Sequence, residues 1–245
     1  KTWPDSPMYM MSLHAGGMIR WKAGWHASAR EWFERMVHAI EALGHSYYYA
    51  GEYYERTGDF ARAMTYYRRG AAQNSSDDRP LNLAGLTRMY QALGMRDSAR
   101  AAAERHDQPA SSHGTPRLLP AILLADGWVD EALRLAGKNV GEQEAKKSAL
   151  GATLATLQLA QLLLDAGRTS EAAREGAKAE RLAVAATLTD ETIEALQVQG
   201  RAQLRDRSVE SITTLLSARA LVRAHPTAAA AMSVESALGD TYAVF

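Results

Sequence analysis

Two glutamates and two histidines in one short stretch are the residues whose spacing best suits metal binding. They are separated by four, three and four positions, so on an α-helix they would lie along one face. Imidazole nitrogens and carboxylate oxygens are zinc ligands, and such a stripe could hold one ion. Gly44, however, is expected to end the helix before the last of them, and a charged stripe on an outward helix face is ordinarily solvated. We therefore expect a solvated stripe and no metal site at Glu34, His38, Glu41 and His45.

Motifs of the common catalytic and nucleotide-binding sites are absent from the sequence. It contains no H-E-x-x-H, P-loop, G-x-S-x-G or S-x-x-K pattern. It also contains no cysteine, which rules out disulfides, thiolate metal sites and a cysteine nucleophile within this chain. We expect no catalytic residue, no cofactor and no enzymatic activity in these 245 residues.

The charge balance disfavours nucleic acid and membrane as partners. Lys+Arg and Asp+Glu both number 28, so the formal net charge is zero. Arginines gather between positions 201 and 223, but Glu194, Asp206 and Glu210 offset part of that charge, and aromatic residues for base stacking are missing there. No apolar run approaches the length of about 18 residues needed to span a bilayer. We expect a cytoplasmic protein.

A glycine followed five residues later by an alanine recurs along the chain and indicates the elements that carry these residues. Successive glycines of this pattern are 34, 36, 33 and 40 residues apart. Regular spacing of this size is typical of arrays of helical pairs. The five pairs are Gly24 and Ala29, Gly58 and Ala63, Gly94 and Ala99, Gly127 and Ala132, and Gly167 and Ala172.

The clearest copy of the pattern is YYYAGEYYERTGDFARAMTYY, residues 47–67. Small Ala50, Gly51 and Ala63 would let two helices approach closely, tyrosines would fill the space around them, and Gly58 would end the first helix. The order and spacing of these residues resemble the tetratricopeptide repeat (TPR), whose signature W-x2-L-G-x2-Y…A-x3-F recurs about every 34 residues. The resemblance implies an all-α fold, a TPR-like α-solenoid that forms a right-handed superhelix of about six and a half helix–turn–helix units.

The repeats suggest a division of the chain into four segments. In the sixth unit Arg207 stands where the turn glycine is expected. Because the seventh unit would end at Phe245 after its first helix, we expect the chain to be a fragment of a longer protein. The expected segments are an N-terminal flank at 1–9, TPR-like units 1–4 at 10–136, a joint at 137–144, and longer units 5–6 with the first helix of a truncated unit 7 at 145–245.

In the TPR family, ligands usually lie against the concave surface made by the first helix of each unit. The lysines and asparagines of the family's clamp for a C-terminal carboxylate are missing from the matching positions, which disfavours a chaperone-tail receptor. Arg88 could instead pair with an acidic group of a partner. Carried over to this sequence, the candidate partner-binding residues are Met18, Trp21, His45, Tyr48, Glu52, Glu55 and Arg88.

Aromatic residues are concentrated in the N-terminal part of the chain. Four of five Trp precede residue 33 and eight of ten Tyr precede residue 68. Exposed methionine and aromatic side chains favour an apolar or helical segment as the partner, bound in the N-terminal groove. The alternative is that Trp21 and Tyr48 pack against the chain's own flanking segment or a missing domain.

The expected function is that of a non-catalytic protein–protein interaction scaffold, which binds a peptide or partner domain in its groove. The longer C-terminal units resemble TPR arrays of large bacterial multidomain proteins, where the array adjoins a CHAT protease, a kinase or a nucleotide-switch ATPase. That resemblance implies a regulatory or signalling role. The alternative is an enzyme, or a sensor that regulates an effector, built on a helical solenoid whose catalytic domain lies outside this chain.

Overall fold

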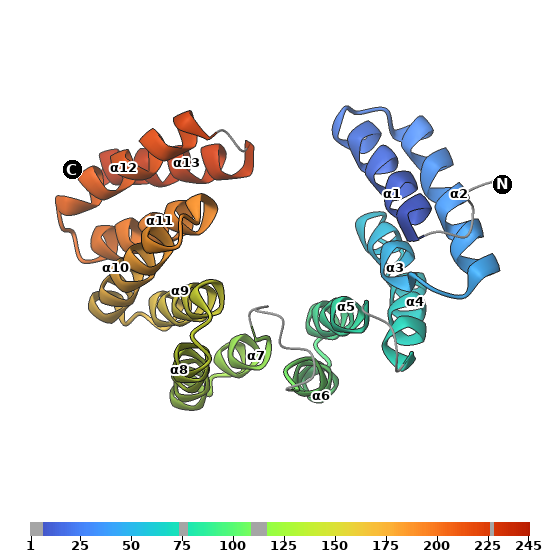
Figure 1. Ribbon diagram of the computed structural model, residues 1–245, viewed down its shortest axis with the longest axis horizontal. Helices are drawn as coiled ribbons and strands as arrows, with labels where there is room; N and C mark the ends of the chain where they lie inside the picture. Colours follow the sequence, from blue (N-terminus) through green and yellow to red (C-terminus); the bar gives the residue numbers. More distant parts are fainter. Residues whose placement is uncertain (1–6, 74–77, 109–116, 226–227) are drawn as a thin grey trace. The chain divides into compact units, whose positions relative to one another are not determined.

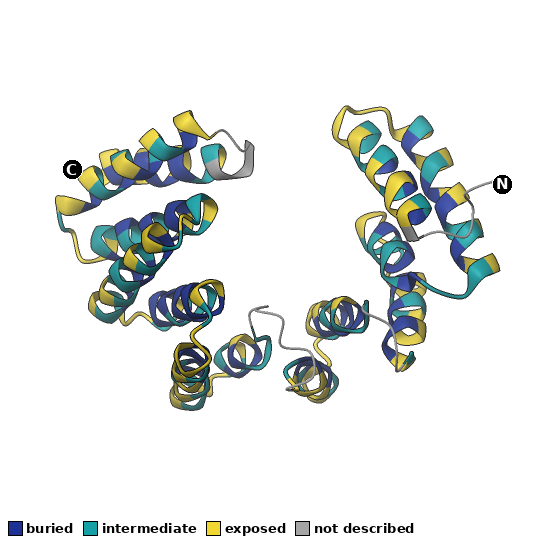
Figure 2. Ribbon diagram, in the orientation of Figure 1, coloured by how far each residue is buried: buried dark blue, intermediate teal, exposed yellow. Residues whose placement is uncertain are grey.

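The computed structural model describes residues 7–73, 78–108, 117–225 and 228–245, and the regular structure in these ranges is α-helical throughout (Figure 1). The helices belong to two compact bodies, an N-terminal body (Lys1–Ser111) and a C-terminal body (Ser112–Phe245). In each body the buried residues follow the faces along which neighbouring helices meet (Figure 2).

The described residues of the N-terminal body form three helical pairs. Consecutive helices pack against each other, and α3 also packs against α5, two helices further along the chain. The helices are α1 (Pro7–Lys22), α2 (His26–Leu43), α3 (Tyr47–Arg56), α4 (Phe60–Ala72), α5 (Arg79–Ala92) and α6 (Arg96–His106).

The C-terminal body continues the same arrangement. Consecutive helices again pack together, and so do α7 with α9, α9 with α11, and α11 with α13. The first helices of successive pairs thus form a layer of their own. The helices are α7 (Leu119–Ala125), α8 (Val129–Ala145), α9 (Ala149–Asp165), α10 (Thr169–Ala185), α11 (Thr189–Arg205), α12 (Glu210–Ala224) and α13 (Ala228–Val244).

The two helices of each pair are joined by a turn with one residue in the left-handed region. The five glycines expected at this place have φ between 69° and 87°. Each donates its N–H to the carbonyl three residues back, and the next N–H donates to the carbonyl five back, at 2.8–3.1 Å. A Cβ atom at these glycines would meet no atom within 4 Å, so the backbone angle rather than lack of space favours glycine there. Arg207 adopts the same turn with φ 54°.

The alanine five residues after each turn glycine is a buried residue near the start of the second helix of its pair. All five alanines are at most 1% exposed. A larger side chain at such a buried position would have to displace its neighbours. The turns, the buried alanines and the paired helices confirm the all-α, TPR-like repeat expected from the sequence.

The segment 137–144 is helical, which corrects the expectation of a joint there. It belongs to the unbroken helix α8. Gly137 and Gly141 lower the helix propensity of this segment by about 1 kcal/mol each, but the buried face of Leu133, Ala136 and Val140 continues through it. The chain divides instead after α6, between Ser111 and Ser112.

The two ends of the chain were expected to hold a flank and a seventh unit. Residues 1–6 of the expected flank lie outside the described residues, and 7–9 form the first turn of α1. Helix α13 occupies the place expected for the first helix of the seventh unit. It packs against α11 and α12 through Val234, Ala237 and Leu238, which are buried.

We predict that Ala63→Leu destabilises the N-terminal body by about 1–3 kcal/mol or more, because a contact of 0% exposure has no room for three further carbon atoms. Ala61→Leu, at an exposed position of the same helix, is the matched control and should change stability by about 0.5 kcal/mol or less. Urea unfolding of both variants checks this. Equal urea midpoints for the two variants would contradict the assignment of Ala63 to the buried face of α4.

Candidate functional site

The side chain of Tyr67 on α4 is wedged between glycines of two neighbouring helices. A Cβ atom at Gly51 on α3 would lie 2.4 Å from the Tyr67 ring, and one at Gly85 on α5 would lie 2.5 Å from it. The ring itself is fully buried. Because a larger side chain at either glycine would collide with the ring, the two glycines let α3 and α5 close on α4. The wedge therefore positions helices that carry most of the expected site residues.

The hydroxyl group of Tyr67 joins an ion pair at the edge of the wedge. It donates to Oε2 of Glu55 at 2.5 Å, and Arg88 on α5 donates to the same carboxylate through Nε at 3.0 Å and Nη2 at 2.9 Å. Burial would raise the pKa of Glu55, but the bonds from Arg88 and Tyr67 outweigh it and hold that pKa below its usual value. Glu55 is therefore a carboxylate that connects α3, α4 and α5.

A second carboxylate on α3 connects this helix to α1. Oε2 of Glu52 lies 2.9 Å from Nε2 of His14, and Oε1 accepts a bond from Nη2 of Arg56 at 2.7 Å. The hydrogen bond from His14 is the main cause that lowers the pKa of Glu52 to about 2, and the bond from Arg56 adds to it against the effect of burial. The His14 ring also lies 4.9 Å from the ring of Tyr49.

Apolar side chains accompany these ion pairs. Met18 and Trp21, one and two turns after His14 on α1, are partly exposed and pack against the core of α1, α2 and α3. The Trp21 ring meets His26 edge-on at 4.7 Å. Tyr48 is also partly exposed, with its ring 6.2 Å from the ring of Tyr67. Burial is the main cause that raises the pKa of Tyr48, so its hydroxyl stays protonated at neutral pH.

The structure brings most of the expected site residues together through contacts that the sequence did not indicate. Glu52 contacts α1 through His14, and Glu55 contacts α5 through Arg88. Arg88 had been expected to meet an acidic group of a partner, and its guanidinium is engaged by Glu55 instead. His45 lies just before α3, where its Nδ1 is 2.8 Å from the hydroxyl of Ser46.

The four residues considered for metal binding do not converge on one point. Glu41 accepts a bond from Arg69 on α4 at 2.7 Å, and His45 is engaged by Ser46. A bond from Tyr66, followed by that from Arg69, lowers the pKa of Glu41. Within the described ranges, no three His, Asp or Glu side chains are grouped closely enough to hold a metal ion.

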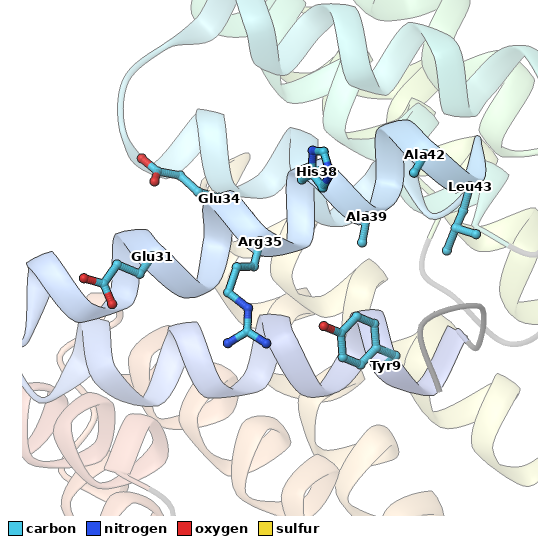
Figure 3. A pocket seen from close by; sticks show the side chains of 8 residues that line it. All are labelled: Tyr9, Glu31, Glu34, Arg35, His38, Ala39, Ala42 and Leu43. Atoms are coloured by element: carbon cyan, nitrogen blue, oxygen red, sulfur yellow. The ribbon is translucent and has the colours of Figure 1, made fainter. Parts of the chain in front are cut away.

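A hollow of about 720 Å³ lies beside α2. Figure 3 shows Arg35, Ala39 and Leu43 on the side of α2 that faces Tyr9 of α1, with the Tyr9 hydroxyl directed toward Arg35. Glu34 and His38 line the hollow as well, on the other side of α2 (Figure 3). Its lining combines apolar and aromatic side chains of Tyr9, Ala39, Ala42 and Leu43 with the charged side chains of Glu31, Glu34 and Arg35.

We predict that Glu52→Gln destabilises the chain at neutral pH, by roughly 1–3 kcal/mol for a pKa shift of this size. The pKa of Glu52 is lower in the folded state than its ordinary value of 4.5. This contribution is therefore fully present above about pH 4.5 and is lost as the pH falls toward 2. Urea unfolding of wild type and variant between pH 3 and 7 measures it.

Glu31→Gln is the control for this prediction, because it makes the same charge change at an exposed residue of α2. Its effect on stability should be small and nearly independent of pH. A difference between wild type and Glu52→Gln that stays constant from pH 7 to pH 3 would contradict the hydrogen bond from His14.

No helix within the described ranges is both long and apolar enough to cross a membrane.

Comparison with known proteins gives a structural likeness only. No family model matches the chain, and no curated protein matches it. Among solved structures the chain is similar to the crystal structure of the P58(IPK) TPR domain, with 12% sequence identity and a TM-score of 0.37. The match covers 96% of this chain, which spans 65% of the length of that domain. Such a distant likeness carries no argument about function, and the TPR-like fold is established by the turns and buried alanines of the chain itself.

Proposed function

We propose that this chain is a non-catalytic protein–protein interaction scaffold, and that a peptide or partner domain binds to one face of α1, α3 and α5. We call it the first-helix face, because each of these helices is the first of its pair. The proposal includes the candidate residues Met18, Trp21, His45, Tyr48, Glu52, Glu55 and Arg88, with His14 added as the partner of Glu52.

The observation that carries the proposal is the pairing of the charges on this face. Glu52 and Glu55 each accept bonds from a neighbouring helix, His14 on one side and Arg88 on the other. Charged side chains that are already hydrogen-bonded to each other leave no unpaired charge to be desolvated when a partner binds. What the face offers to a partner is then the partly exposed Met18, Trp21 and Tyr48.

These side chains are suited to bind an apolar or helical segment. Trp and Tyr present a large contact area and lose little conformational entropy when they are held in place. The ring of Tyr48 lies 6.2 Å from that of Tyr67, and the ring of Trp21 meets His26 edge-on at 4.7 Å. A surface ordered in advance by its own contacts loses less freedom on binding, which favours affinity.

The same pairing supports a role without chemistry. A general acid or base must be free to exchange a proton with a substrate, and its pKa is best near the working pH. Glu52, with a pKa of about 2, is held far from that range by His14. Glu55 is likewise kept ionised by its bonds to Arg88 and Tyr67. We propose a binding surface rather than an active site for that reason.

The test begins with a partner identified by pull-down with the intact chain and then measures its affinity for variants. We predict that Trp21→Ala and Tyr48→Ala each weaken binding at least tenfold, about 1.4 kcal/mol, in a chain that still folds. Folding is followed separately by circular dichroism and urea unfolding. Trp128→Ala and Tyr242→Ala are matched controls, because both side chains are exposed in the C-terminal body.

Normal affinity in both first-helix-face variants would overturn the proposed site. Loss of stability without a separate loss of affinity would show that Trp21 and Tyr48 serve internal packing. Weakening by the two control variants instead would move the site to the C-terminal body.

A further inference from the structure

Helices α4, α5 and α6 enclose a second hollow, of about 340 Å³, within the N-terminal body. Each helix contributes one face to its wall, as the spacing of three and four residues shows. Four of the nine lining residues are alanines, and larger residues at these positions would fill the space. The hollow is lined by Arg68, Ala71 and Ala72 of α4, Leu86 and Tyr90 of α5, and Ser98, Ala101, Ala102 and Arg105 of α6.

Two arginines at this hollow contact only neutral groups. Nε of Arg68 donates to the hydroxyl of Tyr90 at 3.3 Å, and its guanidinium lies over the Tyr90 ring. Nη2 of Arg105 donates to the backbone carbonyl of Ala71, also at 3.3 Å. Within the described residues neither guanidinium forms an ion pair. Most of the donor groups of both side chains remain available to a ligand.

Several other arginines of the same body are paired with an acidic neighbour. Arg69 pairs with Glu41, Arg88 with Glu55, and Arg100 with Glu104. The contrast makes the rim of this hollow a local site of uncompensated positive charge. Two guanidinium groups facing one hollow also repel each other, so a negatively charged ligand between them would relieve an unfavourable interaction.

The surroundings of the hollow are basic although the chain as a whole is neutral. Helices α4, α5 and α6 contain eight arginines and two acidic residues. Four of the eight, Arg62, Arg69, Arg88 and Arg100, are paired with an acidic side chain, and among the described residues Arg68 and Arg105 at the hollow are not. Neither α4 nor α5 has an acidic residue. The two on α6, Asp97 and Glu104, do not line the hollow. Charge complementarity therefore favours an acidic ligand at this place.

The floor of the hollow indicates which kind of side chain a ligand would carry beside its acidic group. It is made of methyl and methylene groups, with Leu86 and Ala102 buried beneath the rim. Such a floor accepts an apolar side chain, whereas a nucleobase would leave most of its polar edge without a partner. A volume of about 340 Å³ has room for one large apolar side chain of a peptide.

We propose that this hollow binds an acidic segment of a protein partner, with an apolar side chain on the alanine floor and carboxylates bound by Arg68 and Arg105. The proposal extends the role of the chain as an interaction scaffold, but the surface is a different one from the first-helix face. Arginine binds carboxylates through two parallel hydrogen bonds, which fixes the orientation of the bound segment.

The test uses the intact chain and a fluorescein-labelled hexapeptide with four glutamates around a central Leu-Phe pair, followed by fluorescence anisotropy. We expect binding that weakens at least tenfold in Ala101→Leu, because the new side chain occupies the hollow from an exposed position and should not disturb folding. Arg68→Ala and Arg105→Ala should each weaken binding several-fold. Arg62→Ala, on α4 but outside the hollow, removes the same charge and should change affinity less than twofold.

Tyr48→Ala separates this proposal from the binding site proposed above, since it alters the first-helix face and should leave hexapeptide binding unchanged. Absence of binding up to about 1 mM peptide, or equal affinity for Ala101→Leu and wild type, would overturn the proposal. So would equal binding of peptides with glutamine for glutamate or serine for Leu-Phe. A single-stranded RNA that binds more tightly and displaces the peptide would overturn the assignment to a protein partner.

Discussion

The packing of Tyr67 between Gly51 and Gly85 is the contact on which the arrangement of the N-terminal body depends. It places three helices within reach of one another, and only then can Arg88 on α5 reach Glu55 on α3. An aromatic ring against glycine backbone gives a close approach that no pair of larger side chains would allow. The hydroxyl group of the same ring donates a hydrogen bond to Glu55. The ring contact and the ion pair of Glu55 with Arg88 therefore stabilise the same arrangement of helices.

Both proposed surfaces of this body follow from how its charges are distributed. On the first-helix face the carboxylates of Glu52 and Glu55 are neutralised within the protein, which leaves aromatic side chains as the binding groups. At the hollow between α4 and α6, Arg68 and Arg105 bond only neutral groups among the described residues, and we propose that their charge binds the ligand. The N-terminal body thus presents an apolar surface and a cationic one, which we propose bind different segments of a partner.

The spacing of residues in the sequence predicted the fold, but it did not predict the bonds between repeats at the candidate site. The turn glycines and the alanines after them could be read from the sequence because each is required by the geometry within one repeat. The bond from His14 to Glu52 and that from Arg88 to Glu55 join residues 38 and 33 positions apart. These bonds depend on how one repeat is positioned against the next. The spacing of residues within a single repeat does not determine that position. The expected joint at 137–144 does not interrupt α8, because the buried face of the helix continues past Gly137 through Val140.

A double-mutant cycle between Tyr67 and Gly85 tests the central packing contact most directly. Gly85→Ala adds a methyl group that would meet the Tyr67 ring, whereas in Tyr67→Leu the ring is gone. Urea unfolding gives the stability of both single variants and of the double variant. We predict that Gly85→Ala is strongly destabilising in the wild-type background and much less so beside Tyr67→Leu, with a coupling energy above about 1 kcal/mol. Additive effects, within about 0.3–0.5 kcal/mol, would contradict the wedge.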